Sequence, residues 1–249
     1  MFNLAISNED KQWLQDTFPS LKIQKGSDGT IEVVGVLSFS MAFLGEEKPY
    51  IINPVADFSE GIQIQDEYKI RIELKKSNFS DLPQVYETGF RLSNIAQSRN
   101  LKTEDLHINY NGAMCLCIKP EEAGYLPSGF NLRDFFQNLV IPFFYAQSYF
   151  EKNNSWLWGQ YSHGSIGLIE WYLRNQNQST EVIKEFFDGL RRDKIFWPMF
   201  QRLLRSKDAI KGHAECICGN KKKFRDCHPE IFRGIWKLKR DVILLKIKI

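Results

Sequence analysis

Two stretches of alternating residues constrain the fold of this chain more than any other feature of its sequence. Every second residue from Ile31 to Phe43 is apolar except Gly35, and between Tyr68 and Lys75 apolar and charged residues alternate without a break. An alternation of period two buries one face of a strand and leaves the other in water, as in an antiparallel sheet covered on a single side. We therefore expect both stretches to be strands of such a sheet.

The neighbouring sequence predicts shorter elements. Ser7 or Asn8 can cap a first helix, which Pro19 ends. Further strands are predicted at 21–24 and 85–86. The polar stretch that follows, through Asp105, predicts no regular element.

Apolar residues recur at helical spacing after Asn131, which can cap the helix that they form. They are Leu132, Phe135, Phe136, Leu139, Val140 and Phe143. This helix is expected to pack on the sheet, with a kink or a restart at Pro142. Further helices are predicted at 166–174, 180–190 and 195–205, the last interrupted by Pro198. This order of elements indicates an α+β fold with helices on one face of a small sheet.

The composition is that of a globular protein. The chain has 249 residues, of which 43% are apolar and 14% aromatic, enough for one or two domains. Its start lacks the pattern of a secretion signal, and its longest apolar stretch, 139–146, is far shorter than a membrane span. The five cysteines give no indication of a disulfide scaffold. We expect a cytoplasmic protein with reduced thiols and no membrane partner.

Charge is distributed unevenly along the chain. From Ser206 onward there are 12 Lys or Arg and 5 Asp or Glu, a net charge of +7, which leaves −4 for the first 205 residues of a chain whose total is +3. A basic end of this kind can contact nucleic acid or an acidic protein, or can simply be a solvated face.

A cysteine on an expected loop is the first candidate for chemistry. The run from His107 to Ile118 has no full charge, contains an Asn-Gly bend at Asn111 and Gly112, and places Cys115 three residues after the glycine. We expect the loop to expose the thiol of Cys115. The alternative is that Cys115 is a small apolar residue in the packing, which is also what we expect of Cys117.

This run resembles the active-site stretch of ubiquitin-conjugating enzymes, in which an Asn-Gly-like turn precedes a Cys-Leu pair. The resemblance covers roughly residues 1–150 and implies a first helix, a four-stranded antiparallel meander and a helix that crosses behind the sheet. The residues that suit the family pattern are Ile108, Asn109, Asn111, Gly112, Cys115, Leu116 and Ile118. The family's His-Pro pair and its Asn eight residues before the cysteine are absent here, and His107 stands at that last position.

The resemblance implies an acyl transferase. Cys115 would accept the C-terminal glycyl group of a ubiquitin-like modifier as a thioester, after an adenylating activating enzyme, and pass it to an amine of a protein target. Some bacterial relatives serve antiphage operons, which suggests the same setting here.

Two histidines are candidates for a catalytic role beside Cys115. His107 could donate a hydrogen bond to the oxyanion in place of the family's Asn, or could only bond the loop backbone. His163, in the glycine-bounded loop 158–164, could deprotonate the incoming amine if it folds back toward Cys115. Capping of the next helix by Ser162 or Ser165 explains that loop equally well.

The C-terminal part carries a metal-binding pattern. Cys216 and Cys218 are separated by eight residues from the adjacent pair Cys227 and His228, and three thiolates with one imidazole make a closed tetrahedral zinc set. The run resembles the SEC-C motif, a small zinc-binding appendage of many bacterial proteins. A closed set indicates a structural zinc that holds together a module too small for a core of its own. His213 lies nearby but does not fit the motif.

The three consecutive lysines 221–223, with Phe232 and Trp236, suggest a docking surface for a protein or for phosphate-rich RNA, and we rank nucleic acid behind a protein partner. The predicted domains are a ubiquitin-conjugating-like domain at 1–150, a helical extension packed on it at 151–205, and a zinc module with a basic tail at 206–249.

Three other functions stay open from the sequence. The chain could be a non-catalytic relative that binds a modifier, which the missing His-Pro pair and Asn favour. It could be a cysteine hydrolase that uses Cys115 and His163. The zinc module could also be the working part, with the rest of the chain as its scaffold.

Overall fold

The two alternating stretches form the central pair of an antiparallel sheet in the computed structural model. The strands are β1 (Leu21–Lys25), β2 (Ile31–Phe43), β3 (Ile51–Ile52), β4 (Ile62–Glu73) and β5 (Gln84–Glu87). They pair in the order β1-β2-β4-β5, and β3 pairs with the end of β2. In β2 and β4, Val33 lies opposite Ile72 and Leu37 opposite Tyr68, and these four side chains are buried. The predicted sheet is confirmed, although β4 begins six residues before Tyr68.

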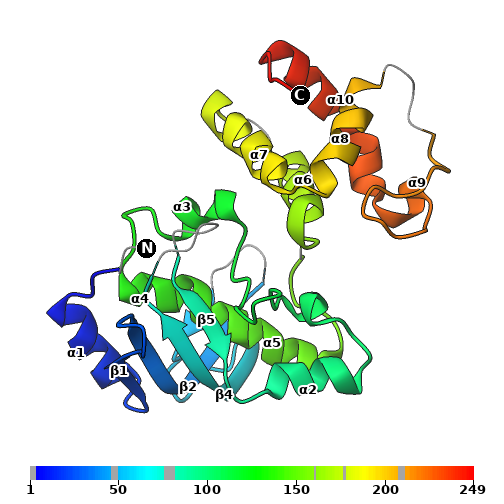
Figure 1. Cartoon of the computed structure of the whole chain (residues 1–249). Coiled ribbons are helices and arrows are strands. Elements are labelled where there is room, and N and C mark those ends of the chain that lie inside the picture. The colour runs from blue at the N-terminus through cyan, green and yellow to red at the C-terminus, as the bar shows by residue number, and fades with distance from the viewer. Residues whose placement is uncertain (1–3, 46–49, 76–81, 160, 176–177, 207–210) are drawn as a thin grey trace. The chain divides into compact units, whose positions relative to one another are not determined.

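The structure describes residues 4–45, 50–75, 82–159, 161–175, 178–206 and 211–249. The chain divides into two compact units, 1–159 and 160–249, seen in Figure 1. This division differs from the boundaries at 150 and 205 in the sequence analysis. The reason is that the helices after residue 163 share a core with the last helix of the chain, as described below.

The first unit contains several helices besides its sheet. They are α1 (Asn8–Thr17), α2 (Arg91–Ser98), the 3-10 turns η1 (Thr103–Leu106) and η2 (Lys119–Glu121), α3 (Glu122–Tyr125), α4 (Leu132–Phe135), the π-helical η3 (Phe136–Val140) and α5 (Ile141–Asn153). Of these, α1 and α5 contact the strands. Ser7 caps α1 as predicted, since its Oγ accepts from the N–H of Asp10 at 2.9 Å. The predicted restart at Pro142 takes the form of the π-helical turn just before it.

The helix α5 crosses the apolar face of the sheet (Figure 1). Its Ser148 hydroxyl lies 3.0 Å from the Tyr68 hydroxyl of β4, and its Phe144 ring lies 4.6 Å from the Tyr68 ring. Tyr145 donates to the carbonyl of Ile62 at 2.6 Å. These contacts bury the Tyr68 side of the sheet, which confirms that helices cover the face that the alternation marked as apolar.

The prediction of an irregular stretch before Asp105 is wrong, because α2 and η1 form there. The helix α2 begins after Phe90, which has a left-handed φ of 58° and provides no side-chain cap, so the usual start signal is missing. What fixes α2 is its tertiary contacts. Leu92, Ile95 and Ala96 are buried in the core.

Arg91, the first residue of α2, joins that helix to the sheet and to α5. Its guanidinium donates to both oxygens of Asp66 at 2.9 and 2.8 Å, and its Nε donates to Glu151 at 2.9 Å. It also lies 4.5 Å from the centroid of the Tyr68 ring. One side chain therefore links three elements of the first unit.

We expect Arg91→Met to lower the free energy of unfolding by about 1–3 kcal/mol, since it leaves two carboxylates without their partner at a site that is partly open to solvent. Burial opposes ionisation of Asp66, but the hydrogen bonds and charge of Arg91, together with hydrogen bonds from Ser148 and the Glu67 backbone, hold the pKa of Asp66 below its usual value. A carboxyl whose pKa is lowered by folding stabilises the folded protein above its unfolded pKa of about 4. This stabilisation is lost as the pH falls through the pKa of the folded state. Urea unfolding at pH 7 and pH 3 should therefore show a smaller difference between wild type and variant at pH 3. Lys69→Met, on the exposed side of β4, is the control, and an equal loss in both variants would contradict the prediction.

The second unit is helical. It contains α6 (Gly164–Arg174), α7 (Thr180–Arg192), α8 (Phe196–Arg205), α9 (Phe224–Cys227) and α10 (Pro229–Leu244). The three helices predicted between 166 and 205 are confirmed, but the interruption at Pro198 is wrong. Pro198 is the third residue of α8, where an N–H has no partner within the helix, so proline costs nothing there.

The core of the second unit joins its first helix to its last. Tyr172 of α6 stacks on Phe186 of α7 at 4.4 Å and donates to Asp241 of α10 at 2.6 Å. Among the residues that the structure describes, no helix has the length and apolar character needed to cross a membrane.

Candidate functional site

Cys115 lies at the end of a tight, hydrogen-bonded loop. Gly112 donates to the carbonyl of Asn109 at 2.8 Å, and Asn109 donates to that of Ala113 at 2.8 Å. Gly112 has a φ of 80°, which glycine adopts without strain. The Asn-Gly bend predicted from the sequence therefore forms.

The loop is attached to the edge of the sheet and sets Cys115 opposite His107. Met114 donates to the carbonyl of Val85 in β5 at 2.7 Å. Ile108 and Met114 form an antiparallel bridge, and the N–H of Cys115 donates to the carbonyl of His107 at 2.8 Å. Cys115 and His107, which are eight residues apart in the sequence, are thus neighbours across the loop.

The thiol of Cys115 is half-buried, whereas the sequence analysis expected it to be exposed. The attachment of Met114 to β5 draws the loop against the sheet, and the Cys115 Sγ lies 3.9 Å from the carbonyl oxygen of Cys117. Burial raises the pKa of the Cys115 thiol. Cys117 is also half-buried and packs against the core, as expected.

We expect the raised pKa of Cys115 to appear in its reaction with iodoacetamide. Because the thiolate is the reactive form, the alkylation rate should rise with pH to an inflection above the ordinary value of about 8.5. Peptide mass spectrometry resolves Cys115 from the other cysteines, and glutathione in the same tube provides the unburied reference. An inflection at or below that of glutathione would contradict the burial of the thiol.

His107 is held by its backbone and by an aromatic contact. It caps η1 with a left-handed φ of 56°, and its ring meets Trp156 edge-on at 5.2 Å. The backbone carbonyl of His107 accepts from Cys115, as described above, and a hydrogen bond from its ring to the loop backbone stays a prediction. The role of its ring toward an oxyanion stays a prediction.

His163 belongs to the second unit, where it is the N-terminal cap residue of α6 and makes no side-chain capping bond. Neither Ser162 nor Ser165 caps that helix. Ser162 instead donates to Glu170 through its N–H at 2.7 Å and its hydroxyl at 2.9 Å, and Ser165 donates to Asp193 at 2.8 Å. These bonds account for the side chains of Ser162 and Ser165. A pairing of His163 with Cys115 stays a prediction.

Gln147 is a residue near the site that the sequence analysis missed. It lies on α5, is 1% exposed, and donates through Nε2 to the carbonyl of Leu106 at 2.8 Å. It therefore holds the peptide that leads into His107. An amide at the end of the apolar stretch 139–146 was the available signal, since a fully buried Gln needs a polar partner.

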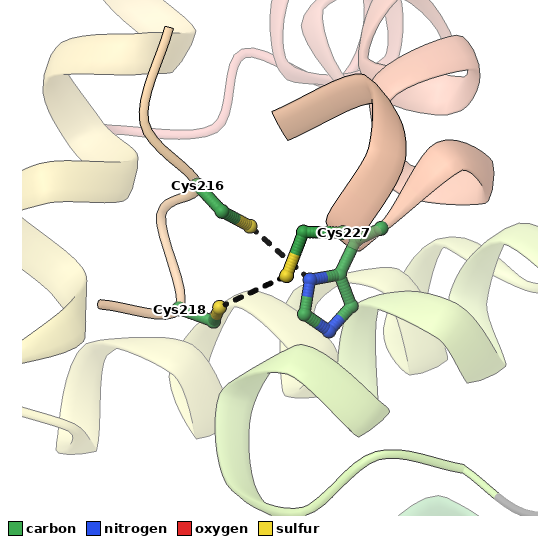
Figure 2. Close-up of side chains that lie close together, drawn as sticks. Cys216, Cys218 and Cys227 are labelled. Atoms are coloured by element: carbon green, nitrogen blue, oxygen red, sulfur yellow. Dashed lines mark hydrogen bonds between the residues drawn. The ribbon is translucent and has the colours of Figure 1, made fainter. Parts of the chain in front are cut away.

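The four predicted metal ligands come together in the second unit. The Sγ of Cys216 lies 3.1 Å from Nδ1 of His228, the Sγ atoms of Cys218 and Cys227 lie 3.6 Å apart, and all four ligand atoms lie within 4.8 Å of one another. Figure 2 shows the three labelled cysteines turned toward one another. His213 is exposed and outside this cluster.

Local backbone structure brings these ligands together. The N–H of Cys216 donates to the carbonyl of Lys222 at 3.0 Å, and that of Gly219 to the carbonyl of Cys216 at 3.2 Å, which closes the tight turn between the cysteines. Gly219 has a φ of 82°, as its place in the turn predicted. Cys227 ends α9 and His228 precedes α10, so the two halves of the cluster are a turn and a helix junction.

The cluster has the donor set and the dimensions of a metal site. Zn–S bonds of about 2.3 Å in tetrahedral geometry place two thiolate sulfurs about 3.8 Å apart, close to the Cys218–Cys227 separation. Burial raises the pKa of Cys216 to about 12. For Cys218, burial acts in the same direction, but hydrogen bonds from the Asn220 backbone and the neighbouring thiols lower its pKa. A bound divalent cation deprotonates such thiols outright, so these four side chains could hold a metal ion.

Comparison with known proteins finds no match to this chain among family models, curated proteins or solved structures.

Proposed function

We propose that residues 1–159 form a ubiquitin-conjugating-like enzyme that carries a ubiquitin-like modifier as a thioester on Cys115 and transfers it to an amine of a target protein. The observation that carries the proposal is the placement of Cys115 on a fixed loop at the sheet edge, with its N–H bonded to His107. The antiparallel strands in the order β1-β2-β4-β5, preceded by α1 and crossed by α5, support the same proposal.

In the proposed loading step, the sulfur of Cys115 attacks the carbonyl carbon of a modifier C-terminal glycine that an adenylating activating enzyme has activated. The C–S bond forms, the activating group leaves, and the thiol proton passes to a base of the loading complex, because the raised pKa keeps Cys115 protonated in the free enzyme. In the transfer step, an amine attacks the same carbonyl carbon, the C–S bond breaks, and the amine proton is lost to a base or to solvent.

The negative charge that develops on the carbonyl oxygen in the transfer step needs a donor, and one preorganised donor contributes about 3 kcal/mol. His107 is the first candidate because it lies opposite Cys115 in the loop register. Gln147 is a positioning residue, since it holds the Leu106 carbonyl just before His107.

The half-burial and raised pKa of Cys115 favour a second candidate, a non-catalytic relative that binds the modifier without carrying it. The two candidates differ in one measurement. The enzyme forms an adduct with the modifier that reducing agent cleaves when activating enzyme and ATP are present, whereas the binding protein forms only a noncovalent complex.

We also propose that the metal held by Cys216, Cys218, Cys227 and His228 is zinc, in a structural role. Three thiolates and one imidazole suit zinc, and a set of four protein ligands leaves no position for a substrate. Metal analysis of the purified full chain tests the identity, with one zinc per chain as the expected result.

A further inference from the structure

The two units carry opposite net charge. Residues 160–249 contain 19 Lys or Arg and 10 Asp or Glu, a net charge of +9, and the remaining 14 and 20 give residues 1–159 a net charge of −6. Most of this positive charge, +7, lies from Ser206 onward, and residues 160–205 add +2. Such a field attracts a polyanion.

A basic and aromatic stripe lies on the outer face of α10. Arg233, Trp236 and Arg240 recur at intervals of three and four residues, which places them on one side of the helix. All three are exposed, and Trp236 exposes 55% of its surface. The buried apolar residues of α10 lie on the opposite side, namely Ile231, Ile235, Leu238 and Val242. Lys239 is also buried, and its ammonium donates to the carbonyl of Ser206 at 2.7 Å. The stripe is therefore not part of the core.

Of the two acidic side chains of α10, Glu230 is paired with a cation of α6, and Asp241 bonds Tyr172 of α6 and forms an ion pair with Arg240. Glu230 accepts from Arg174 at 3.0 Å, and Asp241 accepts from the Tyr172 hydroxyl at 2.6 Å. Asp241 also lies 3.3 Å from Nε of Arg240, whose side chain is still 65% exposed. The outer face of α10 thus presents cations around one indole.

The metal-binding segment lies beside this stripe. The Phe224 ring of α9 meets the Phe232 ring at 5.7 Å, and Phe232 is one helical turn before Trp236. A Cβ at Gly212 would lie 3.0 Å from Arg225 and 3.2 Å from Phe232, so these side chains meet over that glycine. The lysines 221–223, between the two halves of the metal cluster, are exposed.

We propose that Lys221–Lys223, Arg233, Trp236 and Arg240, here named the basic surface, bind single-stranded nucleic acid. The cations contact phosphates, and the indole provides a face on which a base stacks. The ammonium of Lys239 lies 4.9 Å from the centroid of the Trp236 indole and makes a cation–π contact with it. Nucleic acid is the occupant that we favour because one ligand supplies both a phosphate for each cation and a flat base for the exposed indole. This inference goes beyond the proposed conjugation, because it needs neither Cys115 nor a modifier.

The test is fluorescence anisotropy of the full zinc-loaded chain with labelled 20-nucleotide oligo(U) and oligo(dT). Trp236→Leu keeps an apolar side chain but removes the stacking face, and we expect it to raise Kd about fivefold or more. Neutralising Lys221, Lys222 and Lys223 to Gln should reduce the slope of log Kd against log salt by about 2.

Two controls match these variants in exposed positions of the first unit. Phe90→Leu replaces an aromatic side chain that is 69% exposed, and the triple change of Lys11, Lys22 and Lys102 to Gln removes three exposed charges. Both should leave Kd within about twofold of wild type. Three results would overturn the proposal: no measurable binding, equal effects in test and control variants, or competition by polyglutamate as strong as that by unlabelled RNA. The last would assign the surface to an acidic protein.

Discussion

Replacing Cys115 by serine is expected to convert the adduct with the modifier from one that reducing agent cleaves into one that resists it. A serine hydroxyl in the same place forms an oxygen ester, which thiols exchange far more slowly than a thioester. Replacing Cys115 by alanine removes the nucleophile, so the adduct should disappear. The measurement is gel electrophoresis after incubation with a modifier, its activating enzyme and ATP, with and without dithiothreitol.

Cys117→Ser is the matched control because Cys117 is also half-buried, lies two residues away and packs against the core. Its adduct should form at the wild-type level. Thermal unfolding of each variant separates loss of chemistry from loss of fold. A Cys115→Ala protein that folds and still forms the reducible adduct would contradict the proposed conjugating activity. A wild-type protein that binds the modifier without forming an adduct would instead support the non-catalytic binding function.

The sheet was predictable because its signal is local and repeated. The alternation in β2 and β4 marks a buried face residue by residue, and the Tyr68 face proved to be the one under α5. The helix α2 was not predictable in this way. Its stability depends on Arg91 meeting Asp66 and Glu151, which are far away in sequence, and no capping residue marks its start.

The two candidate sites differ in the same respect. The four metal ligands occupy thirteen residues, so spacing alone predicted a cluster that could hold a metal ion. The Asn-Gly bend likewise predicted the loop before Cys115. The burial of Cys115 could not be predicted from the local sequence, because it depends on the hydrogen bond from Met114 to the Val85 carbonyl, on a strand about thirty residues away. Gln147 was missed for a similar reason, since its partner Leu106 lies 41 residues earlier.

Removing the metal is expected to unfold the segment 211–228 while α6 and α10 stay folded. Within that segment only Cys216 and Phe224 are buried, so it has almost no apolar core, and metal binding in such modules supplies most of the folding free energy, about 10 kcal/mol or more in apparent terms. The helices α6 and α10 keep their own contacts, such as that between Tyr172 and Asp241.

Hydrogen exchange should therefore show at least about a 100-fold loss of amide protection in 211–228 after chelation or in Cys218→Ser, with little change in α6. Trypsin should cut faster at lysines 221–223 in the same samples. His213→Ala is the matched control, because His213 lies in the segment but outside the ligand cluster, and it should retain one metal per chain and full protection. Unchanged protection after complete removal of the metal would mean that the fold of the segment does not depend on it. Loss of protection throughout α6 and α10 would mean instead that the metal supports the whole second unit.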